Sequence, residues 1–248
     1  KFFVIDFQNI LRCFSLNSGA EIWNIKTDES FIKSQKTLSL VIINHKIYFS
    51  NSIGDVSAVD IDSGNLIWQT PTQSSAIYDN AFSLKISDLI GDQNSILFSN
   101  NKNEFFSLDI QTGSLNWKQK INSNIRPSIV DNFIFTVSME GFLIVVDNRN
   151  GNILRITDLF KKYGIKRIKR KGILLVRDIA RAKFKPVGFI VGTNNIYLTT
   201  DAGKLFIIDI LTGKTQSILK IDKEKISRPF ILNKNLFIIR DNAIIKLN

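Results

Sequence analysis

A nine-residue phrase recurs along the chain and limits the folds that the chain can adopt, because repeats of fixed period indicate a series of similar structural units. The phrase is Asp-x-x-[Ser/Thr]-Gly-x-x-x-Trp, and it is complete at residues 60–68 and 109–117. An earlier copy at residues 15–23 begins with Ser, and two later copies at residues 147–151 and 209–213 lack the Trp. The glycines of the five copies lie 45, 49, 38 and 62 residues apart. The first three intervals match a period of about 40–50 residues, and the last indicates an insertion.

Each part of the phrase has a physical role in a β-hairpin. The Asp carboxylate can accept hydrogen bonds from the N–H groups of the turn, and the Gly can adopt the positive φ that closes it. The Trp begins the next strand, where its ring can pack against a neighbouring unit. Two further apolar strands precede the phrase, for example residues 40–43 and 46–50. Four short strands per repeat predict an all-β fold, a β-propeller of four-stranded antiparallel blades.

The repeat pattern predicts an incomplete blade at each end of the chain. The first repeat enters at what looks like its second strand, residues 2–6, and the last repeat stops after a third strand at residues 243–248. We therefore expect residues 1–248 to be a single β-propeller domain of about five and a half blades, an incomplete part of a seven- or eight-bladed ring closed by a preceding segment. A self-contained six-bladed ring is the alternative.

Few residues suit catalysis or metal binding. The chain has one Cys and one His, which excludes a disulfide framework and a Cys-based zinc site. Alignment of the repeats on the turn glycine places Cys13 with Ala58 and Ser107 among small residues, so we interpret it as a buried thiol. His45 falls in a predicted hairpin connection. The aromatic residues of the phrase are predicted to dock one blade on the next, with ligand stacking as the alternative: Trp23, Trp68 and Trp117.

The repeats resemble the PQQ-type (quinoprotein) propeller repeat, and within that group the BamB family of the outer-membrane β-barrel assembly machinery. The resemblance runs from about Asp55 to the C-terminus. It includes Trp68-Gln-Thr, the loop Ser87-Asp88-Leu89 and the ending Arg228-Pro-Phe with a terminal Ile-Ile-Lys-Leu-Asn. PQQ-dependent dehydrogenases share the repeat, but they are longer and carry a vicinal Cys pair, an Asp base and Ca²⁺ ligands. The short chain and single Cys argue against that activity.

The resemblance implies a non-enzymatic scaffold with no cofactor and no small-molecule substrate. A BamB-like protein is an eight-bladed propeller in the periplasm of a Gram-negative bacterium, anchored as a lipoprotein to the inner leaflet of the outer membrane. It binds the periplasmic POTRA domains of the barrel protein BamA and assists outer membrane protein assembly. By the resemblance, Asp88 corresponds to an acidic partner contact, although a plain loop residue stays an open interpretation. A second partner contact is expected at Phe31, Ile32 and Lys33.

The insertion is strongly basic. Residues 161–185 carry eleven basic residues against one acidic residue, a net charge of +10, while the whole chain has +11. We call residues 158–185 the basic arm and expect an extended arm or hairpin. It would favour an anionic partner such as lipid phosphates, lipopolysaccharide or an acidic protein, whereas no interleaved aromatic platform supports nucleic-acid binding. A solvated loop is the alternative. The residues expected to carry this binding are Lys161, Lys162, Lys166, Arg167, Lys169, Arg170 and Lys171.

Overall fold

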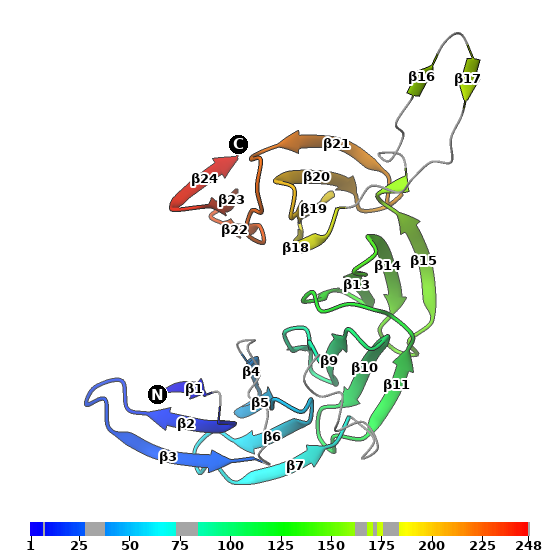
Figure 1. The fold of residues 1–248 in the computed structure, drawn as a ribbon. Helices are drawn as coiled ribbons and strands as arrows, with labels where there is room; N and C mark the ends of the chain where they lie inside the picture. Colours follow the sequence, from blue (N-terminus) through cyan, green and yellow to red (C-terminus); the bar gives the residue numbers. More distant parts are fainter. Residues whose placement is uncertain are drawn as a thin grey trace. The chain divides into compact units, whose positions relative to one another are not determined.

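The computed structural model describes residues 1–6, 8–27, 38–72, 84–161, 168–170, 173–175 and 184–247. Within these ranges the chain folds into antiparallel β-sheets that follow one another along the sequence (Figure 1), and no α-helix occurs there. The predicted series of four-stranded antiparallel sheets is confirmed. The chain divides into two compact units, residues 1–132 with 148–151 and residues 133–147 with 152–248.

The first three sheets follow the strand order of the sequence. The first sheet has three strands and the next two have four each. Their strands are β1 (Phe2–Ile5), β2 (Ile10–Phe14) and β3 (Glu21–Lys26), then β4 (Leu40–Ile43), β5 (Lys46–Ser50), β6 (Val56–Asp60) and β7 (Leu66–Thr70), then β8 (Ile90–Gly91), β9 (Ser95–Asn100), β10 (Glu104–Asp109) and β11 (Leu115–Gln119).

The later sheets repeat this order, with one extra hairpin between the fourth and the fifth. The fourth and fifth sheets have four strands each, and the last sheet has three. Their strands are β12 (Ser128–Val130), β13 (Phe133–Val137), β14 (Phe142–Asp147) and β15 (Ile153–Asp158), then the hairpin β16 (Ile168–Arg170) and β17 (Ile173–Leu175), then β18 (Pro186–Val191), β19 (Asn195–Thr200), β20 (Lys204–Asp209) and β21 (Thr215–Lys220), then β22 (Phe230–Leu232), β23 (Asn235–Arg240) and β24 (Ala243–Leu247).

The hydrophobic core lies between consecutive sheets. Leu11 of β2 is buried with Phe49 of β5, and Tyr48 of β5 is buried with Phe98 of β9. In the second unit, Leu205 of β20 packs with Ile226 and Ile238, which belong to the last repeat. The second sheet therefore buries both of its faces, one against the first sheet and the other against the third. Inner strands such as β9 are buried at every position.

A β-bulge lies at the same place in five repeats. The register of the last strand pair shifts after Cys13, Ala58, Ser107, Val145 and Ile207, which are the five residues aligned by the turn glycine. Cys13, Ala58 and Ser107 each lie directly opposite a Trp, whereas Val145 lies opposite Arg155 and Ile207 opposite Ser217. The small residues thus make room for the indole on the adjacent strand, and larger ones occur where the Trp is lost.

A second recurrent turn joins the middle strands of the sheets. The side chain of Asn51 accepts hydrogen bonds from the N–H groups of Ile53 and Asp55, and Asn100 does the same for Lys102 and Glu104. Ser138 and Thr200 cap the corresponding turns of later sheets through their hydroxyl groups. All four turns therefore begin with a short polar side chain that accepts hydrogen bonds from the backbone N–H groups of its own turn.

Candidate interaction site

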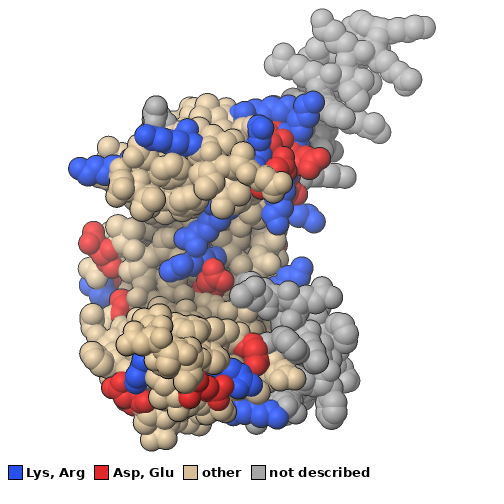
Figure 2. Space-filling model, turned by 90° about the vertical axis from the view of Figure 1, so that its left-hand side faces the viewer, with Lys and Arg blue, Asp and Glu red and all other residues tan. Residues whose placement is uncertain are grey.

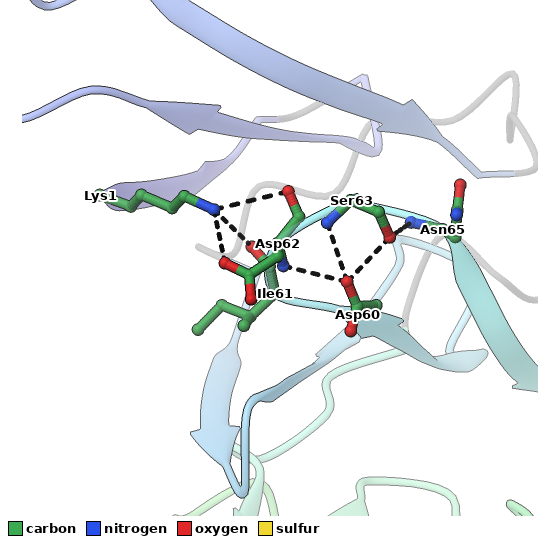
Figure 3. Close-up of polar contacts among 6 residues, drawn as sticks. All are labelled: Lys1, Asp60, Ile61, Asp62, Ser63 and Asn65. Carbon is green, nitrogen blue, oxygen red and sulfur yellow. Dashed lines mark hydrogen bonds and ion pairs between the residues drawn. The ribbon is translucent and has the colours of Figure 1, made fainter.

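The Asp of the phrase holds the hairpin turn through three hydrogen bonds. Asp60 Oδ1 accepts from the backbone N–H groups of Asp62 and Ser63 and from the Ser63 hydroxyl, at 3.1, 2.8 and 2.8 Å (Figure 3). Asp109 repeats this arrangement with Gln111 and Thr112. These bonds favour the ionised carboxylate. The backbone N–H of Thr112, followed by its hydroxyl, therefore lowers the pKa of Asp109 below its ordinary value.

This geometry predicts a pH-dependent contribution to stability. Because the pKa of Asp109 is lowered by folding, its contribution is present above the ordinary Asp value of 3.8 and disappears as the pH falls through the lowered value. Asp109→Asn keeps the acceptor oxygen but loses the charge. We expect the variant to be less stable than the wild type at pH 7, and the difference to narrow as the pH is lowered below 3.8. Urea midpoints measured at pH 7 and at acidic pH test this, and a difference that does not change with pH would contradict it.

Each Trp of the phrase packs on the turn glycine of the following repeat. A Cβ atom built on Gly113 would lie 2.6 Å from Trp68 Cδ2, and one on Gly151 would lie 2.6 Å from Trp117 Cδ2. The indole N–H groups also donate hydrogen bonds, Trp68 to the Ile110 carbonyl at 3.3 Å and Trp117 to the Asn148 carbonyl at 3.0 Å. Both acceptors are the residue directly after the Asp of the next phrase, so one docking contact is repeated.

Arg155 occupies the Trp position of the fourth phrase and makes the same contact with different chemistry. Its Nη2 donates to the Ile210 carbonyl at 2.8 Å, and Nη1 donates to the carbonyl of Leu211. A Cβ on Gly213 would lie 3.1 Å from its Nε. Ile210 directly follows Asp209, so the guanidinium uses the acceptor position that the indole N–H uses elsewhere. In the sequence alone, this copy reads only as a phrase without its Trp, and the role of Arg155 is visible only in the structure.

The first copy of the contact is arranged differently. The Trp23 ring covers Gly64, but its Nε1 has no hydrogen-bond partner among the residues that the structure describes. The corresponding carbonyl, that of Ile61, instead lies 3.5 Å from Lys1 Nζ, which also donates to Asp62 Oδ1 at 2.7 Å (Figure 3).

The loop that carries Asp88 is fixed on both sides. The N–H of the buried Ser87 donates to the carbonyl of Ser99 on β9 at 2.8 Å. The Ser87 hydroxyl accepts from the Ser99 N–H at 2.9 Å and donates to the Asp88 carbonyl at 3.1 Å. On the other side, the N–H of the buried Leu89 donates to Ser39 Oγ at 2.9 Å. Asp88 itself is partly exposed. The backbone at Asp88 is therefore held in place at the entrance to β8.

A loop with the same bonds occurs in the second unit. Ser227 Oγ accepts from the Ile239 N–H at 2.8 Å and donates to the Arg228 carbonyl at 2.9 Å. Arg228 therefore stands where Asp88 stands in its own repeat, with the opposite charge. Arg228 Nε also donates to the Phe189 carbonyl at 3.2 Å, so this side chain lies along β18. In both loops the Ser hydroxyl bonds a strand residue twelve positions later, Ser99 in one case and Ile239 in the other.

The remaining predicted positions are only partly described. The predicted contact Phe31, Ile32 and Lys33 lies outside the described residues. In the basic arm, Lys161 is exposed, and Lys169 and Arg170 belong to β16. Cys13 is buried, and burial raises the pKa of its thiol. His45 lies with Asn44 at the hairpin turn between β4 and β5, both with positive φ. The positions outside the described residues are Lys162, Lys166, Arg167 and Lys171.

The charged side chains of the described surface are mixed in sign. Figure 2 shows acidic and basic side chains interspersed with uncharged surface on the part of this face that is described. No three His, Cys, Asp or Glu side chains within the described ranges come together as metal ligands. The same part of the chain holds no helix of the length and hydropathy needed to cross a membrane.

Comparisons with known proteins identify the fold. The family model for the outer membrane protein assembly factor BamB matches residues 1–157. The crystal structure of BamB from Moraxella catarrhalis is similar with a TM-score of 0.53 and 14% identity, covering 97% of this chain and 78% of that one. The β-propeller domain of Myceliophteria thermophila Cps50 (Swd1) has a TM-score of 0.60 and 13% identity, covering 84% and 62%. No curated protein sequence matches. The predicted all-β propeller class is confirmed, whereas blade number and single-domain organisation stay predictions.

Proposed function

The chain belongs to the family of the outer membrane protein assembly factor BamB, and from this membership we propose that it is a non-enzymatic propeller scaffold for outer membrane protein assembly. In this role it binds the periplasmic POTRA domains of a BamA-type protein. The proposal places the protein in the periplasm of a Gram-negative bacterium, at the inner leaflet of the outer membrane. The matched residues 1–157 include the Asp88 loop and all three Trp contacts.

The observation that carries this proposal is the fixed loop around Asp88. Ser87 and Leu89 are buried and hydrogen-bonded, so the backbone on either side of Asp88 loses little freedom when a partner binds. Preorganisation of this kind improves affinity because the ordering cost is already met in the free protein. A single carboxylate on a rigid loop suits a basic or hydrogen-bond-donating group on the partner.

Charge reversal at this loop tests the contact. Asp88→Arg is expected to weaken binding to a purified POTRA fragment of the same organism's BamA-type protein roughly 30-fold, from a loss of about 2 kcal/mol at a central contact. Isothermal titration calorimetry measures the affinity. The melting temperature is expected to stay within about 2 °C of the wild type, since a substitution on the partly exposed surface changes stability little.

Asp62→Arg is the matched control. It makes the same charge change on an exposed turn of the same unit, where the ion pair with Lys1 contributes little. Normal POTRA affinity of Asp62→Arg beside weakened affinity of Asp88→Arg supports the assignment. If Asp88→Arg bound the POTRA fragment as tightly as the wild type, Asp88 would not be part of the contact. If the wild type did not bind at all, the scaffold proposal would be rejected.

A further inference from the structure

The loop that carries Asp88 has a second loop beside it in the same unit. β8 and β12 are the first strands of the third and fourth sheets, and Cα atoms of the two strands come within 8 Å of each other. Asn100, at the end of β9, forms an antiparallel bridge with Ile86 and a parallel bridge with Asn122. The segments that lead into β8 and β12 are therefore anchored at the same residue and lie side by side.

Arg126 has in the fourth sheet the position that Asp88 has in the third. Asp88 lies seven residues before Ser95, the β9 residue that pairs with the Asp of the phrase. Arg126 lies seven residues before Phe133, the β13 residue that pairs with the Asp of the next phrase. Equivalent positions of consecutive repeats lie at the same end of their sheets. An acidic and a basic residue thus occupy one position in two adjacent loops.

The backbone around Arg126 is fixed on both sides. The N–H of the buried Ser123 donates to the Asn100 carbonyl at 3.1 Å, and the Ser123 hydroxyl accepts from the Ile125 N–H at 3.1 Å. Ile125 is 5% exposed, and Pro127 is buried as well. The proline ring also fixes φ at residue 127. The backbone at Arg126 therefore loses little freedom when a partner binds, which favours affinity.

Pro127 also changes how this end of the third sheet joins the next one. Ser39, seven residues before the β5 residue that pairs with the Asp of its phrase, has the position of Asp88 in the second sheet. Its Oγ accepts from the N–H of Leu89 in the third sheet at 2.9 Å. Pro127 has the position of Leu89 in the fourth sheet, and a proline has no N–H to donate. The bond that Ser39 makes to its neighbouring sheet is therefore not open to Asp88.

The guanidinium of Arg126 is not used within the part of the chain that the structure describes. The side chain is exposed and makes no hydrogen bond, ion pair or ring contact there. The other arginines whose side chains are described all have partners, for example Arg12 with Glu21, Arg155 with the Ile210 carbonyl, Arg228 with the Phe189 carbonyl and Arg240 with Asp222. Arg126 can therefore donate all of its N–H groups to a carboxylate of another molecule.

We propose that Arg126 is a second contact for the partner that binds Asp88, and that it binds an acidic side chain of that partner. This inference rests on the proposed scaffold function. The matching surface of the partner carries a basic or hydrogen-bond-donating group beside an acidic one. Opposite charges in adjacent loops also set the orientation of the bound domain, because turning the domain round would bring like charges together.

Charge reversal at Arg126 tests the contact in the POTRA titration described above. Arg126→Glu is expected to weaken binding roughly tenfold, which corresponds to about 1.4 kcal/mol. Lys120→Glu makes the same charge change at another exposed position of the same unit and is expected to bind normally. Both variants are expected to melt within about 2 °C of the wild type, since they alter exposed side chains.

A variant with exchanged charges separates the placement of the charges from their sum. Asp88→Arg combined with Arg126→Glu keeps the net charge of the wild type but interchanges the two signs. We expect it to bind more weakly than either single variant, by at least roughly 100-fold, because each side chain then meets a like charge on the partner. If only the total charge of the surface mattered, the exchanged variant would bind like the wild type.

Each contrary result has a distinct meaning. Weakened binding by Asp88→Arg beside unchanged binding by Arg126→Glu would overturn this inference and leave the scaffold function in place. Equal losses in Arg126→Glu and Lys120→Glu, or wild-type affinity of the exchanged variant, would show that no specific acidic group meets Arg126. No binding by the wild type would reject the scaffold function and this contact with it.

Discussion

Trp117→Ala is expected to lower the free energy of unfolding by about 3–5 kcal/mol, the usual cost of removing a large buried aromatic side chain. The indole is buried, meets Phe105 edge to face at 5.6 Å, and covers Gly151 of the next phrase. Its loss opens a cavity between two repeats and leaves the Asn148 carbonyl without its donor. Chemical denaturation, monitored by far-ultraviolet circular dichroism of the backbone, measures the change.

Two companion variants separate the sources of this loss. Trp117→Phe keeps most of the ring but removes the N–H, so we expect a loss of about 1–3 kcal/mol. Trp23→Ala is expected to cost less than Trp117→Ala, because Trp23 is less buried and its Nε1 has no partner in the described structure. If Trp117→Ala, Trp117→Phe and Trp23→Ala all had melting temperatures near that of the wild type, the indoles would not stabilise the contacts between repeats.

Gly203→Ala is expected to destabilise the protein by about 2–5 kcal/mol, from positive φ and from overpacking together. Gly203 has φ of +67°, and a Cβ there would lie 2.6 Å from the Glu224 carbonyl oxygen and meet the Asp222 backbone as well. A side chain could relieve such a contact by changing its rotamer, but these backbone atoms cannot. The chain also uses Gly203 as an acceptor for the N–H groups of Ile221 and Asp222, so displacement would break these bonds.

Gly19→Ala is the control for the backbone contribution alone. Gly19 has nearly the same φ, +70°, but nothing lies within 4 Å of a Cβ built there. We expect a loss of about 1–2 kcal/mol from the left-handed conformation. Equal losses in the two variants, measured by urea denaturation, would show that the contact with residues 222 and 224 has no effect.

The fold could be predicted because its signal is local. The phrase Asp-x-x-[Ser/Thr]-Gly fixes a turn within five residues, and its glycines all take positive φ, from +70° to +75°. The strands that precede these turns, such as β6, β10 and β14, are mostly apolar because they are buried on both faces. Cys13, Ala58 and Ser107 do occupy equivalent positions, but the reason for their small size, a Trp directly opposite on the next strand, requires the strand register.

The features that sequence reasoning missed depend on contacts between repeats. In the sequence, Arg155 only marks a copy of the phrase that lacks its Trp. The structure shows that its guanidinium donates to the Ile210 carbonyl, 55 residues away. Asp88 and Arg228 are equivalent because the preceding Ser of each bonds a strand residue twelve positions later. The residue types at these positions do not indicate this equivalence. The partner contact at Asp88 and the use of the basic arm stay predictions, because a chain alone does not name what binds it.

The bulges in the last strand pairs bear on the solubility of the protein. Outer strands β7, β11 and β15 carry exposed apolar residues, among them Leu66, Leu115 and Leu154, along with N–H and C=O groups that face away from their sheet. Such an edge invites pairing with the edge of another molecule. A bulge in each strand twists the edge and interrupts the even spacing that a foreign strand would need. The bulge, which recurs whether or not a Trp follows it, is thus expected to disfavour edge-to-edge pairing between molecules.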